Sequence, residues 1–297
     1  MDSFFVAFRG VTPVFRILDW NISYHGSADS KVELLKMIIG ETKGKYPCLV
    51  ALQEVTEKAY MAIIKAGLFS SHAFSLHYRK PGKLEGNNRG LGCLIGVTGG
   101  ISIVGSSLID RVLFPERALL ATVNLNGREF EAISFHALTG VAFKKGKSAQ
   151  FAALAEYLNH YKGKPFVLCC DLNEPKIDHY DLDQVEFFDQ LGDKGQFACY
   201  ILGANDVHDL KDAYRLWLRW NRKDYQRVKE GQSESEDLES YPLAVSHVLT
   251  GGKKKRYDYI MVSPHFKVSN ITYKYEDAVR CGSDHAVVVA DLEWKGF

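Results

Sequence analysis

A series of short, apolar, strand-like runs that alternate with helical segments is the feature that most constrains how this 297-residue chain folds. Apolar runs between turn formers are typical of strands, and apolar residues every three or four positions are typical of helices. Strand-like runs occupy residues 14–20, 48–52, 91–97, 101–104, 118–125, 129–135, 165–170, 257–262, 267–275 and 286–292. Helical segments fall near residues 30–40, 56–66 and 151–163. This order predicts an α/β sandwich of two packed sheets.

One segment, residues 206–252, departs from this alternation. It contains a Trp- and Arg-rich helical piece at 216–220 and an acidic run at 233–237. Long irregular stretches inside compact domains usually have a function. We therefore interpret 206–252 as an insertion or a long active-site loop within a single domain that spans residues 1–297, since no repeat or linker divides the chain.

The charge balance and the composition exclude several classes of protein. The chain has 37 Lys and Arg residues against 36 Asp and Glu residues, a formal net charge of +1, and 46% of its residues are hydrophobic. These values argue against a disordered chain and against a wholly basic nucleic-acid coat protein. No apolar run approaches the roughly 18–20 residues of a membrane helix, and the first residues do not resemble a signal peptide. We expect a soluble, intracellular protein with no membrane anchor.

The six cysteines are not spaced for a metal site or a disulfide framework. None belongs to a C-x-x-C pair, and Cys169 and Cys170 stand together in an apolar run. We therefore expect reduced thiols in the core and no zinc site.

Polar side chains that can carry chemistry stand where several strand-like runs end. The sequences at these ends are Trp20-Asn21, Gln53-Glu54-Val55, His136-Ala137, Asp171-Leu172-Asn173, Tyr257-Asp258-Tyr259 and Ser283-Asp284-His285. A single Asn or Asp after a strand is most often a turn former, and a single His is most often structural. Their joint occurrence favours one shared site, because strand ends that face the same way gather these residues into a cleft.

The residue types at these ends are chemically compatible. Carboxylate and amide oxygens without a cysteine suit a hard divalent cation such as Mg²⁺ or Mn²⁺. Two histidines beside them suit contact with an anion or proton transfer. A cation among acids that faces imidazoles is what hydrolysis of a phosphate ester requires, because the cation neutralises charge on the phosphoryl oxygens. The sequence therefore predicts a metal-dependent hydrolase of phosphate esters.

In order and spacing, these motifs resemble those of the endonuclease/exonuclease/phosphatase superfamily, also called DNase I-like. The ordered set is Trp-Asn, Gln-Glu-Val, His, Asp-x-Asn, Asp-Tyr-Ile and Ser-Asp-His, and it spans residues 14–292. The resemblance implies a four-layer α/β/β/α sandwich of two packed mixed β-sheets flanked by helices.

The resemblance also implies roles for the matching residues. Glu54 would be the main metal ligand, Asn21 would help to hold the ion or the phosphate, and Asp284 would complete the acidic side that faces the metal. Asp171 would position or deprotonate the attacking water, and Asn173 would bind a phosphoryl oxygen.

Two histidines complete the implied site. His285 would face the scissile phosphate in an orientation fixed by Asp258, and His136 would contact or protonate the phosphate. The sequence His136-Ala137-Leu138 resembles the DNase I and cytolethal-toxin branches. In the DNase I branch, a glutamate partners the histidine at this position. Glu85 is a candidate for that partner, and Arg89 lies in the same neighbourhood. Residues 246–256 lack the tryptophan of the abasic-site endonuclease branch, which argues against abasic-site repair.

Loop residues offer further contacts to a substrate. The basic run Lys253, Lys254, Lys255 and Arg256 would bind backbone phosphates if it flanks the metal cleft; otherwise it is a solvated loop. Trp217 and Trp220 would either stack on bases or pack against the body of the protein.

Our leading hypothesis is a Mg²⁺- or Mn²⁺-dependent phosphodiesterase, most plainly an endonuclease with a nucleic-acid substrate. The first alternative is a phosphatase or phosphodiesterase that acts on inositol phosphates or lipid headgroups. The second is a non-catalytic binding module that retains the fold; such proteins usually lose a metal or histidine position, and none is missing here.

Overall fold

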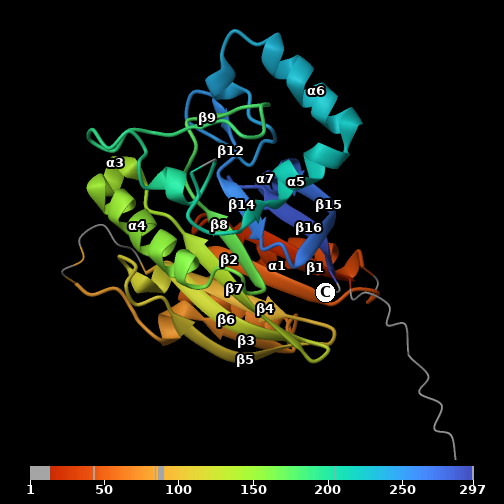
Figure 1. Ribbon diagram of the computed structural model, residues 1–297. Coiled ribbons are helices and arrows are strands. Elements are labelled where there is room, and N and C mark those ends of the chain that lie inside the picture. Colours follow the sequence, from red (N-terminus) through yellow and green to blue (C-terminus); the bar gives the residue numbers. More distant parts are fainter. Residues whose placement is uncertain (1–13, 43, 84, 86–89, 204, 296–297) are drawn as a thin grey trace, which may run out of the picture.

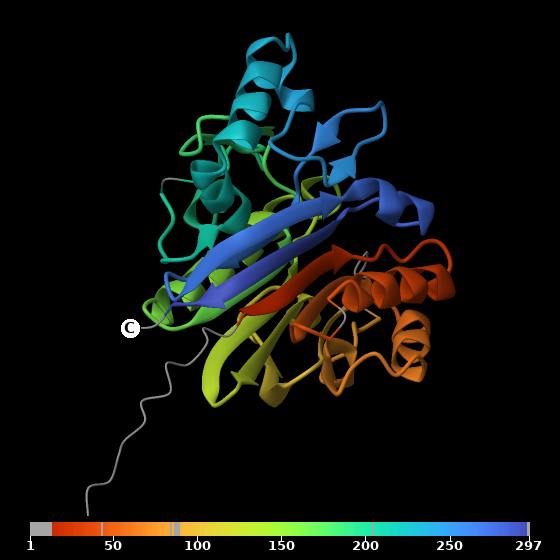
Figure 2. The same ribbon diagram turned by 90° about the vertical axis from the view of Figure 1, so that its right-hand side faces the viewer.

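Two six-stranded β-sheets pack face to face, and helices cover their outer faces (Figure 1, Figure 2). The computed structural model describes residues 14–42, 44–83, 85, 90–203 and 205–295. The strand order is β15-β16-β1-β2-β4-β3 in the first sheet and β11-β14-β8-β7-β6-β5 in the second. The α/β/β/α sandwich implied by the motifs is confirmed.

The strands and helices follow the predicted runs closely. The first sheet comprises β1 (Val14–Asn21), β2 (Cys48–Val55), β3 (Ser71–Phe74), β4 (Gly92–Val97), β15 (Phe266–Lys274) and β16 (Val287–Trp294). The second comprises β5 (Ile101–Leu108), β6 (Ala118–Leu125), β7 (Arg128–His136), β8 (Phe166–Asp171), β11 (Lys211–Asp212) and β14 (Asp258–Val262). The helices are α1 (Ala28–Gly40), α2 (Glu57–Lys65), α3 (Gly140–Phe143), α4 (Lys145–His160), α5 (Ala213–Trp220), α6 (Arg222–Ser233) and α7 (Tyr275–Arg280). The short edge strand β3 was not predicted, because its sequence Ser-His-Ala-Phe has no apolar run.

The side chains of β1 alternate between two apolar layers. Phe15 and Ile17 lie in the core between the sheets, whereas Leu18 and Trp20 pack with residues of α1 and α2. This is the period-two pattern of a strand that is buried on both faces. On the second sheet, Phe151 of α4 covers the outer face in a third apolar cluster.

Two parallel strand pairs determine where the polar strand ends meet. β1 pairs in parallel with β2, and β7 pairs in parallel with β8. Parallel strands end at the same edge of a sheet, so each pair presents two carboxyl ends side by side. β14 runs antiparallel to β8 and therefore begins at this edge, where Asp258 lies opposite Asp171.

The predicted two-residue hairpin between β6 and β7 is confirmed. Asn126 and Gly127 have φ angles of +53° and +85°. Two positive φ values in succession match the twist of the flanking strands, which explains the Asn-Gly sequence.

The irregular region between β8 and β14 begins directly after Asp171, earlier than residue 206. It contains β9 (Ile177–Asp178) paired with β10 (Val185–Glu186), then α5 and α6, and then β12 (His247–Val248) paired with β13 (Lys254–Lys255). In Figure 1, α6 lies at the top of the molecule, away from the sandwich. The buried carboxylate of Asp178 ties this region together by binding Arg215 of α5 and Arg256 before β14.

All six cysteines are free thiols; Cys48, Cys93, Cys169 and Cys170 are buried in the core, whereas Cys199 and Cys281 are partly exposed. Within the described part of the chain, none of the helices combines the length and the apolar character that crossing a bilayer would need.

Candidate active site

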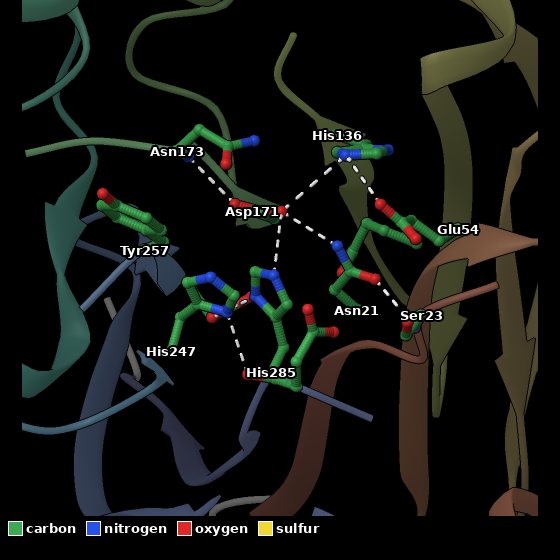
Figure 3. A network of polar contacts seen from close by, with 12 residues as sticks. Asn21, Ser23, Glu54, His136, Asp171, Asn173, His247, Tyr257 and His285 are labelled. Carbon is green, nitrogen blue, oxygen red and sulfur yellow. Dashed lines mark hydrogen bonds and ion pairs between the residues drawn. The ribbon is translucent and has the colours of Figure 1, made fainter. Parts of the chain in front are cut away.

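The polar ends of β1, β2, β7, β8 and β14 meet at one end of the sandwich, together with the loop before β16 (Figure 3). β1 and β2 belong to one sheet, and β7, β8 and β14 belong to the other. The site therefore lies across the junction of the two sheets.

Asp171, the last residue of β8, lies at the centre of this group. Its Oδ2 accepts a hydrogen bond from Asn21 Nδ2 (2.9 Å), and its Oδ1 accepts one from the Asn173 backbone N–H (2.9 Å). The same Oδ2 lies 3.8 Å from Nε2 of His136 and 3.8 Å from Nε2 of His285. Burial, together with the nearby charge of Asp258, raises the pKa of Asp171 to about 7 against the opposing effect of His285.

His285 forms a buried ion pair with Asp258. Its Nδ1 lies 2.9 and 3.0 Å from the two carboxylate oxygens of Asp258, which is itself fully buried. Burial alone lowers the pKa of His285, but the charges of Asp258 and Asp171 outweigh it and raise this pKa to about 10. His285 is therefore an imidazolium at neutral pH whose Nε2–H faces Asp171.

His136 has the opposite protonation behaviour. Its Nδ1 lies 2.9 Å from Nη1 of Arg117, which can only donate, so Nδ1 accepts and the ring proton resides on Nε2. Burial and the positive charge of Arg117 lower the pKa of His136 well below its usual value. His136 is a neutral ring whose Nε2–H faces Asp171 and also Glu54 Oε1, which lies 3.5 Å away.

Glu54 is turned toward this centre by an irregularity in β2. Its φ is +56°, and the register of β2 against β4 shifts between Leu52 and Val55. Non-glycine residues rarely adopt this left-handed conformation, and those that do often lie at functional sites. The backbone N–H of Tyr24 donates to Glu54 Oε2 (3.1 Å), which fixes the carboxylate.

The donor atoms of the site are those that a hard divalent cation takes. Carboxylates come from Glu54, Asp171 and the exposed Asp284, and an amide oxygen comes from Asn21. Ligand atoms of Asp171, Asp258 and His285 lie within 4.8 Å of one another. An oxygen-rich set with an imidazole and no thiolate fits Mg²⁺ or Mn²⁺.

No family model and no curated protein matches this sequence. Solved structures do match it. The human Nocturnin catalytic domain with a bound sulfate anion is 20% identical, with a TM-score of 0.59 over 96% of each chain. An endonuclease/exonuclease/phosphatase from Bacteroides vulgatus is 16% identical, with a TM-score of 0.56 over 95% of this chain and 99% of that one. D. rerio TDP2 complexed with a single-strand DNA product is 12% identical, with a TM-score of 0.61 over 94% of this chain and 99% of that one.

The chain has the endonuclease/exonuclease/phosphatase fold. Within this endonuclease/exonuclease/phosphatase fold, the residues that the motifs singled out lie together at one end: Asn21, Glu54, His136, Asp171, Asn173, Asp258, Asp284 and His285. Asn173 Nδ2 donates to the carbonyl of Ala137, which orients its side chain at the end of β7.

Two residues of the basic run do not form part of a solvated patch, which corrects the prediction that they bind substrate phosphate. Lys255 is 2% exposed, and its Nζ lies 3.1 Å from Glu239. Arg256 is fully buried and forms ion pairs with Asp178 (2.6 Å) and Asp212 (2.7 Å). Their charges are neutralised inside the protein, and their role is structural.

The other two residues of the run are exposed. Lys253 lies 3.1 Å from Glu239, and its side chain is 46% exposed. Lys254 is exposed as well. Their contact with phosphate stays a prediction.

The structure places Arg117 beside His136, where the sequence suggested Glu85. The Glu85 carboxylate binds the Arg79 guanidinium and the backbone N–H of Gly82. The other candidate, Arg89, lies outside the described residues.

The sequence motifs missed two residues of the site and left the roles of two tryptophans open. Arg117 and His247 belong to none of the motifs, and only proximity in the fold identifies them. Trp217 packs on the core beside Tyr214, whereas Trp220 is 85% exposed.

Proposed function

We propose that this protein is a divalent-metal-dependent phosphoesterase that cleaves nucleic-acid phosphodiester bonds. The observation that carries the proposal is the position of Asp171. It lies 3.8 Å from the Nε2 atoms of a cationic and a neutral histidine, and it accepts a hydrogen bond from Asn21.

Each residue of the site would have its own role in the hydrolysis. Glu54, Asn21 and Asp284 would hold Mg²⁺ or Mn²⁺, which neutralises the charge of the phosphoryl group when bound. Asp171 has a pKa of about 7 and therefore suits a general base that takes a proton from the attacking water. Asp258 holds the ring of His285, and the Nε2–H of this ring would donate to a phosphoryl oxygen.

His136 and Asn173 would complete the binding of the phosphate. The neutral ring of His136 offers one N–H, and the Asn173 amide offers the N–H that Ala137 does not bind. Donors on both sides of Asp171 would hold the phosphorus in line with the activated water.

The solved structures support the choice of phosphate and of nucleic acid. D. rerio TDP2 is complexed with a single-strand DNA product, and the Nocturnin catalytic domain holds a sulfate anion. The exposed Lys253 ends the turn between β12 and β13, the exposed Lys254 begins β13, and His247 begins β12 of the same hairpin. They would meet the backbone of a nucleic acid.

The test is cleavage of supercoiled plasmid and of a single-stranded oligonucleotide with Mg²⁺ or Mn²⁺, comparing wild type with Glu54→Ala. We expect cleavage by the wild type only, abolished by EDTA. If the protein releases phosphate from inositol polyphosphates or lipid headgroups and does not cleave nucleic acid, those compounds are its substrates instead. Absence of turnover on every substrate would favour a non-catalytic binding module.

A further inference from the structure

A histidine from the irregular region packs on the ring of His285. The ring centroids of His247 and His285 are 4.3 Å apart, and the ring planes meet at 29°. Tyr257 stacks on His247 at 5.7 Å and 25°. Figure 3 shows His247 between Tyr257 and His285. The ring of His285 is therefore bounded on one side by His247.

Backbone contacts fix the position of His247 relative to Asp258 and His285. His247 and His285 form an isolated antiparallel bridge, and the Ala286 N–H donates to the Ser246 carbonyl (2.7 Å). The Ser246 hydroxyl oxygen accepts hydrogen bonds from the backbone N–H groups of Tyr257 (2.8 Å) and Asp258 (3.2 Å). Residues 246–247 thus connect the start of β14 to the loop before β16.

The orientation of the His247 ring is itself fixed. Its Nδ1 lies 2.9 Å from the backbone carbonyl oxygen of Asp284, which can only accept, so Nδ1 carries the proton. His285 is likewise held through its Nδ1, by Asp258. The contact with Asp258 fixes the Nδ1 edge of the ring, and the stacked face of His247 restricts the tilt of the ring plane.

We propose that His247 is a positioning residue whose stacked ring holds Nε2–H of His285 toward Asp171 and the scissile phosphate. This inference rests on the function proposed above. Neither the motifs nor the solved structures assign a role to His247, which comes from the end of the segment interpreted as an insertion. Misplacement of a reacting group by about 1 Å can cost about 100-fold in rate, so a stacked ring at this position has a measurable effect.

The first test is steady-state kinetics of three variants. We expect His247→Ala to lower kcat by about 10- to 100-fold with KM within twofold, because the phosphate ligands stay intact. His247→Phe keeps a flat ring and should recover most of kcat. Val248→Ala, a matched control on the other face of β12, should keep the wild-type kcat. Wild-type kcat in His247→Ala, or no recovery in a folded His247→Phe, would overturn the proposal.

The second test does not depend on turnover. In protein with labelled histidines, the ring signals of His285 should shift in His247→Ala, since the ring current of His247 is lost, and should broaden as the ring gains freedom. His247→Phe should keep them sharp. Unchanged His285 signals in His247→Ala would refute positioning. A wild-type protein without phosphoesterase activity would refute the proposed function instead, and the ring signals would still decide the positioning role.

Discussion

Asp171 and His285 both lower the free energy of unfolding as the pH rises, although one is an acid and the other a base. The pKa of Asp171 is raised to about 7, so the folded protein holds this proton up to a higher pH than the unfolded chain does. The pKa of His285 is raised to about 10, so its contribution to stability is complete below the unfolded value of about 6.5 and is lost between there and about 10. Both groups make the metal-free protein less stable as the pH rises.

This gives a prediction for the free energy of unfolding. In EDTA, the loss of stability between about pH 6.5 and pH 10 should be smaller in His285→Gln than in the wild type, because only the wild type has the raised pKa of His285. Urea unfolding at pH 6.5 and pH 10 measures the difference. The exposed His160→Gln should follow the wild type. An equal loss in His285→Gln and in the wild type would show that His285 is not the group responsible.

At the scale of elements, one carboxylate joins α5, β9 and the start of β14. Asp178 is buried and accepts from Arg215 and Arg256, and its second oxygen also accepts from the Leu243 backbone N–H (3.2 Å). Burial raises the pKa of Asp178, but the two guanidinium groups outweigh burial and lower it to about 2. The stability that this carboxylate contributes is present above the unfolded pKa of about 3.9 and is lost as the pH falls toward 2.

Asp178→Asn should therefore destabilise the protein by about 3–5 kcal/mol, because it leaves two buried guanidinium groups to share the single carboxylate of Asp212. The matched control is Asp183→Asn, which breaks an exposed pair with Arg219 and should cost about 1 kcal/mol or less. Urea unfolding at pH 7 compares the two variants. Equal effects would mean that the buried cluster does not hold these elements together.

Buried ion pairs explain why the structural role of Lys255 and Arg256 could not be predicted from the sequence. In the sequence, Lys255 and Arg256 belong to a charged loop after two glycines. One partner of Arg256, Asp178, lies 78 positions away, and Lys255 pairs with Glu239, 16 positions away. A charged residue is recognised as buried only when the fold brings its counter-charge to it.

At the scale of the whole molecule, one aromatic cluster of the core lies toward the opposite end of β7 from the site. Phe15, Phe130, Phe266 and Trp294 form a cluster of edge-to-face and tilted rings. Phe130 lies near the start of β7, whereas His136 ends it, so six residues at about 3.3 Å each, or roughly 20 Å, separate them. Stability and activity should therefore be separable.

Phe130→Ala should lower the free energy of unfolding by about 3–5 kcal/mol through loss of packing. The same variant should keep the wild-type kcat at temperatures where it is folded. Thermal unfolding and initial rates measured on one preparation check both statements. A folded Phe130→Ala protein with a large loss of kcat would show that the far end of the sandwich shapes the site.

Much of this arrangement could be predicted, because the apolar runs and the polar residues that end them are local signals. Asp171 follows an apolar run directly, and Asn126-Gly127 specifies its own turn. Contacts between distant segments carry no local signal. The pairing of Arg117 with His136 and the stacking of His247 on His285 appear only once the strands are ordered into sheets.

The most direct test is the initial rate of phosphodiester hydrolysis against Mg²⁺ concentration for wild type, Glu54→Gln and Glu57→Gln. Glu57 lies in the first turn of α2 and pairs with Lys80 at the surface, so it controls for loss of a nearby carboxylate. We predict saturable Mg²⁺ dependence for wild type and Glu57→Gln, and a loss of about 100-fold or more in Glu54→Gln. Equal rates in all three proteins, or a rate independent of Mg²⁺, would contradict a metal-dependent phosphoesterase site at Glu54.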